Sequence, residues 1–221
     1  MKKLVIFDLD GTLLNTIADL AAASNHALEQ CGFPRHAPSS YPFFVGNGVT
    51  KLIERILPED ERTPANIQKM RTCFGEYYDL HGTDLSEPYP GIRQLLDELT
   101  ERNIAIAVAS NKYQSAVERL INPFFPQYSW AAVEGHKEDW PVKPDPSIVF
   151  DILAKHPTPK QDVLYVGDSG VDMETARRAC VESCGVTWGF RPESELTANF
   201  ADHIAHTPDE VLRIATSEEI I

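Results

Sequence analysis

The sequence predicts an α/β protein built on a parallel sheet, with a helical insertion near the N-terminus. Short apolar runs alternate with longer segments whose apolar residues recur at helical spacing, which is typical of parallel-sheet proteins. One run, Ile104 to Ala109, is apolar throughout, as expected for a strand that is buried on both faces. Between the first apolar run and Gly82, the patterns are helical and no clear strand is found.

The N-terminal part of the chain is predicted to form one buried strand followed by helices. The strand covers Lys3 to Phe7 and leads into the loop Asp-Leu-Asp-Gly-Thr. The next patterns are helical and cover Ile17 to Cys31, Val49 to Leu57 and Pro64 to Leu80. Gly32 ends the first of these helices, and a loop rich in Pro and Ser runs from Arg35 to Pro42. We therefore expect residues 15–82 to form a helical insertion.

The rest of the chain alternates between helix and strand patterns. The predicted helices are Pro90 to Arg102, Tyr113 to Ile121, Ser147 to Lys155, Val171 to Cys180 and Asp209 to Ala215. The predicted strands are Ile104 to Ala109, Trp130 to Val133, Val163 to Val166, Cys184 to Trp188 and Ile204 to Ala205. With the first strand, these elements are expected to form an α/β core from residues 1–14 and 83–221.

Composition and charge exclude several classes of protein. The chain has 221 residues, of which 43% are hydrophobic, enough for a sizeable core. Its net charge of −13 argues against a nucleic-acid partner, because phosphate backbones are bound by basic surfaces. No apolar run reaches the roughly 18 residues of a membrane-spanning helix, so no membrane partner is expected. Asp8 and Asp10 interrupt the first apolar run too early for a secretion signal, and we therefore predict a cytoplasmic protein.

Polar and charged residues lie beside the predicted strands, where open parallel sheets bind ligands. Asp8 and Asp10 come after the first strand, one residue apart, so that both would face the same side if the strand continued. The other candidates are Ser110, Asn111 and Lys112 after the Ile104 run, Lys143 in a Pro-rich loop, and Gly167, Asp168, Ser169 and Asp172 after the Val163 strand. Carboxylates, a hydroxyl and a lysine together are the groups that phosphoryl transfer with a hard metal ion requires.

Each kind of side chain has an expected task in that chemistry. Carboxylate oxygens suit Mg²⁺, and one carboxylate can act as nucleophile while another acts as acid and base. Ser110 and the amides around Asn111 can hold phosphate oxygens at a helix N-terminus. Lys143 can neutralise the charge that develops on the phosphoryl group.

These motifs resemble those of the haloacid dehalogenase-like hydrolases. The matching segments are Asp8-Leu9-Asp10-Gly11-Thr12, Ser110-Asn111, Lys143-Pro144, and Gly167-Asp168-Ser169 with Asp172 after it. Their order and spacing fit the family, and together they span nearly the whole chain. The resemblance implies an α/β fold with a Rossmann-like parallel sheet core and an inserted all-helical cap, which residues 15–82 would form.

The resemblance also implies the role of each residue. Asp8 would be the nucleophile and a Mg²⁺ ligand, and Asp10 the general acid and base, with its main-chain carbonyl on the metal. Asp168 would complete the metal site. The remaining residues would bind phosphate or support the site: Ser110, Asn111 and Lys143 for phosphate, and Thr12 and Asp172 as supports, the latter for the metal or for Lys143.

Within the family, the chain looks most like the phosphoglycolate phosphatases. Val45-Gly46-Asn47-Gly48 and Trp188-Gly189-Phe190-Arg191 carry this finer resemblance, while Asn15 and Thr16 depart from the Asp-Ser that relatives often carry. The implied function is Mg²⁺-dependent hydrolysis of a small phosphate monoester through a phospho-aspartate. The expected partner is a small phosphorylated metabolite, and the chain would be a monomer or a homodimer.

Other functions on the same scaffold stay open. A phosphosugar mutase would return the phosphoryl group to a sugar, and a pyrophosphatase or nucleotidase would cleave a different phosphate. A non-enzymatic binding protein is disfavoured, because binding alone would not need Asp8, Asp10, Lys143 and Asp168 together.

Overall fold

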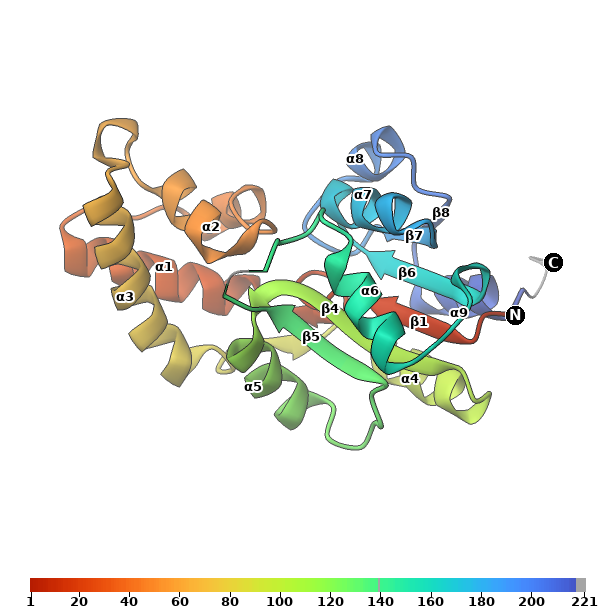
Figure 1. Cartoon of the computed structure of the whole chain (residues 1–221). Helices are drawn as coiled ribbons and strands as arrows, with labels where there is room; N and C mark the ends of the chain where they lie inside the picture. The colour runs from red at the N-terminus through yellow and green to blue at the C-terminus, as the bar shows by residue number, and fades with distance from the viewer. Residues whose placement is uncertain (139, 218–221) are drawn as a thin grey trace.

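A wholly parallel, six-stranded sheet forms the centre of the molecule (Figure 1). The computed structural model describes residues 1–138 and 140–217. The strands in spatial order are β5 (Ala132–His136), β4 (Ala105–Tyr113), β1 (Leu4–Phe7), β6 (Val163–Gly167), β7 (Glu182–Val186) and β8 (His203–Ala205). The first strand is thus central, with Phe7 in register with Val108 on one side and Val166 on the other. The residues after Phe7 therefore emerge in the middle of the sheet edge.

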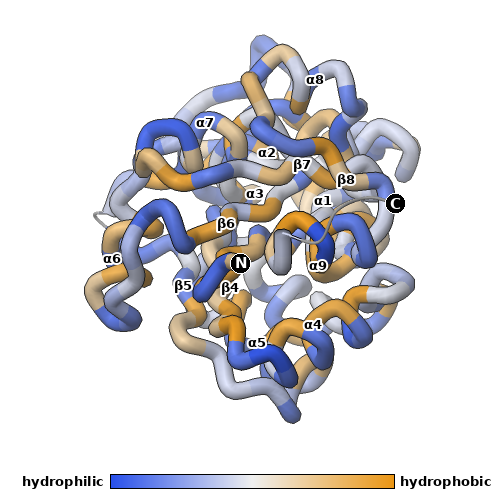
Figure 2. Tube along the Cα trace, turned by 90° about the vertical axis from the view of Figure 1, so that its right-hand side faces the viewer, coloured by the Kyte–Doolittle hydropathy of each residue, from blue (hydrophilic) through white to orange (hydrophobic). Residues whose placement is uncertain are grey.

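Helices cover both faces of the sheet, as the all-apolar strands require. On one face lie α4 (Ile92–Glu101), α5 (Gln114–Phe124) and α9 (Pro208–Thr216), and on the other lie α6 (Ser147–Lys155) and α7 (Gly170–Ala179) (Figure 2). Along β1 the side chains alternate between the two layers. Val5 and Phe7 belong to the cluster under α4, α5 and α9, whereas Leu4 and Ile6 belong to the cluster under α6 and α7.

A separate group of helices lies at the carboxyl end of the strands (Figure 1). It contains α1 (Ile17–Cys31), α2 (Gly48–Ile56) and α3 (Pro64–His81), with short 3-10 helices at Pro38–Phe43 and Glu59–Glu61. We call residues 15–82 the helical segment. Its apolar side chains form their own cluster, in which Ala116 of α5 is the one buried member, among the described residues, from outside the segment. The segment therefore has an interior largely of its own.

The chain leaves and re-enters the core through a short antiparallel pair. β2 (Leu14–Asn15) pairs with β3 (Glu87–Pro88), so the two crossing points are neighbours in space. The carboxylate of Asp19, in the first turn of α1, accepts hydrogen bonds from the main-chain amides of Leu85 and Ser86 at 2.7–3.1 Å. These contacts fix the base of the helical segment.

The predicted strands and helices all occur, with local differences. The sequence patterns missed the β2–β3 pair, the helix α8 (Glu193–Ala198) and the 3-10 helix at Pro38–Phe43, which lies in a stretch expected to be loop. Two-residue strands and six-residue helices are too short to produce a clear hydrophobic period. In the part of the chain that the structure describes, no helix combines the length and apolar character needed to cross a membrane.

The largest difference concerns strand β4. The prediction ended it at Ala109 and placed Ser110 and Asn111 at a helix N-terminus, which is wrong. The strand continues to Tyr113 with a shift in its pairing to β5 after Ala109, and α5 begins at Gln114. The apolar residues end at Ala109, where the strand leaves the core and enters the site, but the backbone stays extended as far as Tyr113.

Candidate active site

Asp8 lies at the centre of the site, directly after the central strand β1. The residue is 8% exposed, and its Oδ1 accepts a hydrogen bond from Lys143 Nζ at 2.8 Å. Lys143 comes from the loop between β5 and α6, and its ammonium also donates to Ala109 O at 3.0 Å and to Asp172 Oδ1 at 2.7 Å. All three ammonium protons thus have acceptors, and the charge of Lys143 is held against Asp8.

Asp172 orients Lys143 from the first turn of α7. Ser169 caps this helix in a reciprocal arrangement: the Ser169 side chain accepts from the Asp172 amide, and Asp172 Oδ2 accepts from Ser169 N at 3.2 Å and Oγ at 2.5 Å. The other oxygen, Oδ1, accepts hydrogen bonds from Lys143 Nζ at 2.7 Å and from the Tyr165 hydroxyl at 3.3 Å. Both oxygens of Asp172 are therefore already engaged.

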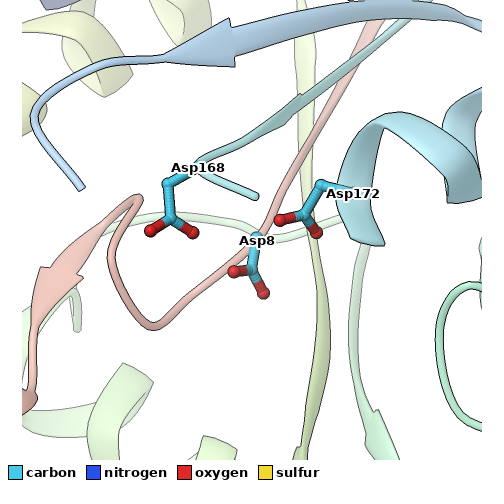
Figure 3. Close-up of side chains that lie close together, drawn as sticks. All are labelled: Asp8, Asp168 and Asp172. Atoms are coloured by element: carbon cyan, nitrogen blue, oxygen red, sulfur yellow. The ribbon is translucent and has the colours of Figure 1, made fainter. Parts of the chain in front are cut away.

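Asp168, directly after β6, faces Asp8 and Asp172 (Figure 3). Ligand atoms of the three carboxylates lie within 4.8 Å of one another. Gly11 and Gly189 make room for the Asp168 side chain, since a Cβ on either would lie 2.3 Å from one of its atoms. The amide of Phe190 donates to Asp168 Oδ2 at 2.6 Å, which fixes the direction of the carboxylate.

The electrostatics of this cluster are dominated by burial and by negative charge. Burial raises the pKa of Asp8 to about 7, with Asp172 acting in the same direction and Lys143 opposing. Burial, Asp8 and Asp172 together raise the pKa of Asp168 well above its usual range. Burial alone would lower the pKa of Lys143, but Asp172 and Asp8 outweigh it and raise that pKa. One lysine cannot balance three carboxylates, so the cluster has an excess of negative charge.

This excess makes the cluster a fitting site for a divalent cation. The donors are carboxylate oxygens, which hard cations prefer, and a bound cation would offset both the burial and the mutual repulsion that raise the pKa values of Asp8 and Asp168. Asp8 and Asp168 are the better candidates for ligands, because the oxygens of Asp172 already accept hydrogen bonds from Lys143 and Ser169.

Asp10 lies outside that cluster and is held by other groups. Thr16 Oγ1 donates to Asp10 Oδ1 at 2.5 Å, and Lys112 Nζ lies 3.1 Å from the same oxygen. Lys112 also donates to the hydroxyl of Tyr78 on α3 at 3.0 Å. Asp10 is thus positioned by a residue of β4 that at the same time contacts the helical segment.

The residues predicted to bind phosphate lie close to this centre. Ser110 is 2% exposed and its Oγ accepts from the Lys112 amide at 3.1 Å, which leaves the hydroxyl proton free to donate. The Asn111 side chain is used for support: Oδ1 accepts from Lys143 N at 2.7 Å, and Nδ2 donates to Lys143 O at 3.1 Å and Gly46 O at 3.3 Å. Thr12 is fully buried, and its Oγ1 has no hydrogen-bond partner in the described part of the chain.

A cavity of about 360 Å³ connects these residues to the helical segment. Asp8, Ser110, Lys143 and Asp168 line it on the core side. The helical segment contributes residues of α1, α2, α3 and the turn before α2: Leu20, Val45, Gly46, Gly48, Val49, Leu52, Gln68, Arg71, Thr72, Phe74, Gly75, Tyr78 and Asp79. The site is therefore a chamber between the two regions, with the carboxylate cluster on the core side.

The structure brings together the residues that the motifs indicated and adds others. Lys112 was noted beside Ser110 without a role, although its place after the same strand was a usable signal. Arg71 and Tyr78 lie in the helical segment without a motif, and only the packing of α3 over the sheet shows that they line the cavity. Arg191 was named only as part of the Trp188–Arg191 motif. It donates hydrogen bonds to Pro42 O at 2.6 Å and Val45 O at 2.7 Å, and so connects the core to the helical segment.

Comparison with known proteins supports the family suggested by this geometry. The family model described as haloacid dehalogenase-like hydrolase matches residues 5–186. The phosphoglycolate phosphatase of Vibrio parahaemolyticus is 30% identical over 217 residues, covering 96% of this chain and 95% of the relative. The phosphoglycolate phosphatase of Vibrio cholerae is 33% identical over 193 residues, covering 85% of each chain.

Solved structures agree with these sequence matches. A crystal structure from Lactobacillus delbrueckii subsp. bulgaricus superimposes with a TM-score of 0.92 at 30% identity, covering 97% of this chain and 99% of that chain. The parallel sheet, the carboxylate cluster and the full-length matches lead to one assignment. The chain belongs to the haloacid dehalogenase-like hydrolases, and it is a phosphatase similar to the phosphoglycolate phosphatases.

Proposed function

We propose that this phosphatase is Mg²⁺-dependent and hydrolyses a small phosphate monoester, with phosphoglycolate as the first candidate, through a phospho-aspartate on Asp8. The observation that carries the proposal is the state of the Asp8 carboxylate. Lys143 holds its Oδ1, whereas Oδ2 accepts no hydrogen bond from any described residue and belongs to a side chain that lines the cavity. An oriented carboxylate with one free oxygen is suited to attack phosphorus.

The metal would be held by Asp8, Asp168 and the main-chain carbonyl of Asp10. Bound Mg²⁺ would supply positive charge that offsets the negative charge of the phosphoryl oxygens. Asp172 would keep Lys143 in place, and Lys143 and the Ser110 hydroxyl would hold the remaining phosphate oxygens.

The first step transfers the phosphoryl group to the protein. Asp8 Oδ2 forms a bond to phosphorus as the bond to the leaving oxygen breaks. A protonated Asp10 gives its proton to that oxygen, so the substrate leaves as an alcohol. Lys112 and Thr16 direct the Asp10 carboxylate in this reaction.

The second step releases phosphate and restores the enzyme. Water attacks the phosphorus of the phospho-aspartate while the Asp10 carboxylate takes its proton. The bond between phosphorus and Asp8 breaks, inorganic phosphate leaves, and both aspartates return to their starting states.

We assign residues 15–82 as a cap domain that closes over this reaction, and residues 1–14 and 83–221 as the catalytic core. The separate apolar cluster of the helical segment and its attachment through β2 and β3 support this division. The substrate assignment rests on the phosphoglycolate phosphatases that match the chain along nearly its whole length. Cytoplasmic location, the absence of nucleic-acid and membrane partners, and a monomeric or homodimeric state stay predictions.

Phosphate release from a panel of substrates tests the proposal. The panel is phosphoglycolate, pyrophosphate, a nucleotide and a hexose phosphate, each with Mg²⁺ and with a chelator. We expect phosphoglycolate to show the highest kcat/KM, and the chelator to abolish turnover. If phosphate is released fastest from pyrophosphate or from the nucleotide, the protein is a pyrophosphatase or a nucleotidase instead. Isomerisation of the hexose phosphate without phosphate release would favour a mutase.

A further inference from the structure

Cationic side chains surround the cavity, and nearly all of them are neutralised by a neighbouring carboxylate. The lining cations are Arg71, Lys112, Arg119, Lys143 and Arg191. Lys143 is paired with Asp8 and Asp172, and Lys112 with Asp10. Arg119 forms an ion pair with Asp79, and Arg191 lies 3.7 Å from Glu195. Their positive charges are largely compensated by these carboxylates, and of the four only Lys143 lies beside the reacting group.

Arg71 differs from the others. It lies on α3, and within residues 1–138 and 140–217 no carboxylate approaches its guanidinium to ion-pair distance. Its contact is with the neutral hydroxyl of Tyr113, at the end of β4, which accepts a hydrogen bond from Arg71 Nη2. One hydrogen bond leaves most of the five guanidinium donors available.

Among residues 1–138 and 140–217, the groups that contact Arg71 hold its guanidinium without forming an ion pair with it. Its guanidinium lies 5.9 Å from the centre of the Tyr113 ring, and that ring packs against His136 at 5.3 Å. Burial and the nearby Arg71 charge lower the pKa of His136, with Glu138 opposing them, so the imidazole is uncharged at neutral pH. A fixed, partly buried guanidinium beside neutral rings is typical of a site that awaits an anion.

The position of Arg71 relative to the reacting group indicates which part of a substrate it would meet. Gln68, Arg71, Gly75 and Tyr78 line the cavity from one face of α3. Tyr78 marks the end of that face beside Lys112 and Asp10, and Arg71 lies about two turns, or ~10 Å, further along the helix. Arg71 thus lies in the same chamber as the phosphate-binding groups, about two helical turns from the residue of α3 that contacts Lys112.

We propose that Arg71 binds a second anionic group, a carboxylate or a second phosphate, carried by the leaving group of the substrate. The inference rests on the proposed phosphatase function and adds to it the residue that would select monoesters that are anionic at both ends, as phosphoglycolate is. Tyr113 holds the guanidinium in position, so that a bidentate contact can form without reordering the side chain.

Binding of non-hydrolysable analogues tests this without requiring turnover. Calorimetry with Mg²⁺ would compare 3-phosphonopropionate, propane-1,3-bisphosphonate and propylphosphonate on the wild-type protein and on Arg71→Gln. We expect the wild-type protein to bind at least one of the doubly anionic compounds about ten- to a hundredfold more tightly than propylphosphonate, as a charged hydrogen-bonded contact predicts. Arg71→Gln should lose that preference while propylphosphonate binding changes less than about threefold.

Arg119→Gln is the matched control, because it removes a lining arginine whose charge is already paired with Asp79. It should keep the preference for the doubly anionic compounds. Whichever of these two compounds shows the preference identifies the second group as carboxylate or phosphate. Equal binding of all three compounds by the wild-type protein, or an equal loss for all three in Arg71→Gln, would show that Arg71 is structural only.

Turnover separates this inference from the function on which it rests. If phosphate is released from monoesters but Arg71→Gln raises KM equally for phosphoglycolate and ethyl phosphate, the phosphatase assignment stands and the Arg71 proposal is wrong. If the doubly anionic analogues bind in the Arg71-dependent way and no ester is hydrolysed, the Arg71 proposal stands and the proposed hydrolysis is wrong.

Discussion

The core and the helical segment contribute to the site in different ways. From the core come Asp8, Asp10 and Asp168, which follow strand ends, where the sheet fixes the backbone, and Lys143, which reaches Asp8 from the loop between β5 and α6. The helical segment adds no carboxylate to the cluster but supplies one face of α3, with Arg71 and Tyr78 on it. The positions of the core carboxylates therefore depend on sheet geometry, whereas the positions of Arg71 and Tyr78 depend on how one helix packs over the sheet.

The largest expected effect is on Asp8. Asp8→Asn is nearly isosteric but offers a poor nucleophile, so we expect turnover to fall by more than about a hundredfold, or ~3 kcal/mol in activation free energy. Circular dichroism should show an unchanged fold. Asp60→Asn, an exposed aspartate of the helical segment, serves as control and should keep full activity. More than about a hundredth of the wild-type rate in Asp8→Asn would contradict the covalent mechanism.

Asp10→Asn should separate the two chemical steps. Loss of a general acid and base typically costs about a hundred- to ten-thousandfold in rate, so phosphoglycolate hydrolysis should fall by that factor. A nitrophenyl phosphate needs no proton on its leaving group, so Asp8 should still become phosphorylated and then stay so. Intact-protein mass spectrometry after acid quench would detect the added phosphate. Near wild-type turnover of both substrates would remove Asp10 from the mechanism.

Excision of the helical segment tests whether the core can act alone. Replacing residues 15–82 by a short linker is feasible because β2 and β3 bring the two ends together. We expect a folded core in which kcat/KM for phosphoglycolate falls by about a hundredfold or more, and that for an aryl phosphate by less. Thermal unfolding would check the fold. A core that does not fold, or an equal loss of kcat/KM for both substrates, would contradict the assignment of chemistry to the core and substrate selection to the helical segment.

Lys112 connects the two regions, and its removal should have a moderate effect. Lys112→Met removes the ion pair with Asp10 and the hydrogen bond to Tyr78. We expect kcat for an alkyl phosphate to fall about tenfold, with little change in KM, because a misplaced acid slows proton transfer. Tyr78→Phe keeps the Lys112–Asp10 pair and should retain most of kcat. A change in KM alone would show that Lys112 serves binding instead.

The smallest expected effect is on stability without metal. The pKa of Asp8 rises from 3.8 to about 7 on folding, so the folded protein holds a proton that the unfolded chain has already lost. Its contribution to stability is therefore present at low pH and is lost as the pH rises toward 7. Relative to Asp8→Asn, the free energy of unfolding should fall on the order of 1–2 kcal/mol between about pH 5 and pH 7.

Urea unfolding at several pH values with a chelator would measure this difference. Addition of Mg²⁺ should weaken the pH dependence, because a bound cation favours the charged form of Asp8. A difference between the two proteins that does not change with pH would mean that Asp8 does not carry the raised pKa.

The sequence was informative where chemistry lies directly after a strand. Asp8, Asp10 and Asp168 could be predicted because buried runs mark the strands and the ends of parallel strands meet at one edge of the sheet. Lys143 lies in a Pro-rich loop and was predicted from its charge and from the Lys143-Pro144 motif. Asn111 could be identified as a site residue, but its role could not be predicted. Its side chain binds the main-chain amide and carbonyl of Lys143, and this contact depends on a strand that continues to Tyr113.

The residues of the helical segment were less accessible to such reasoning. Tyr78 and Arg71 show only ordinary helical spacing, and their meaning depends on which face of α3 points into the cavity. That orientation is set by packing against α1, Ala116 and Phe190, which are far away in the sequence. Local patterns contain no record of contacts of this kind.

The loop after β7 gives the cavity a property of its own. Phe190 holds Asp168, and the next residue, Arg191, holds the carbonyls of Pro42 and Val45 in the helical segment. For the segment to swing away from the sheet, either these charge-assisted hydrogen bonds break, each worth roughly 1.5–3 kcal/mol, or the loop moves and Asp168 moves with it. Opening of the cavity would then be coupled to the position of Asp168, because two adjacent residues, Phe190 and Arg191, hold that carboxylate and the helical segment.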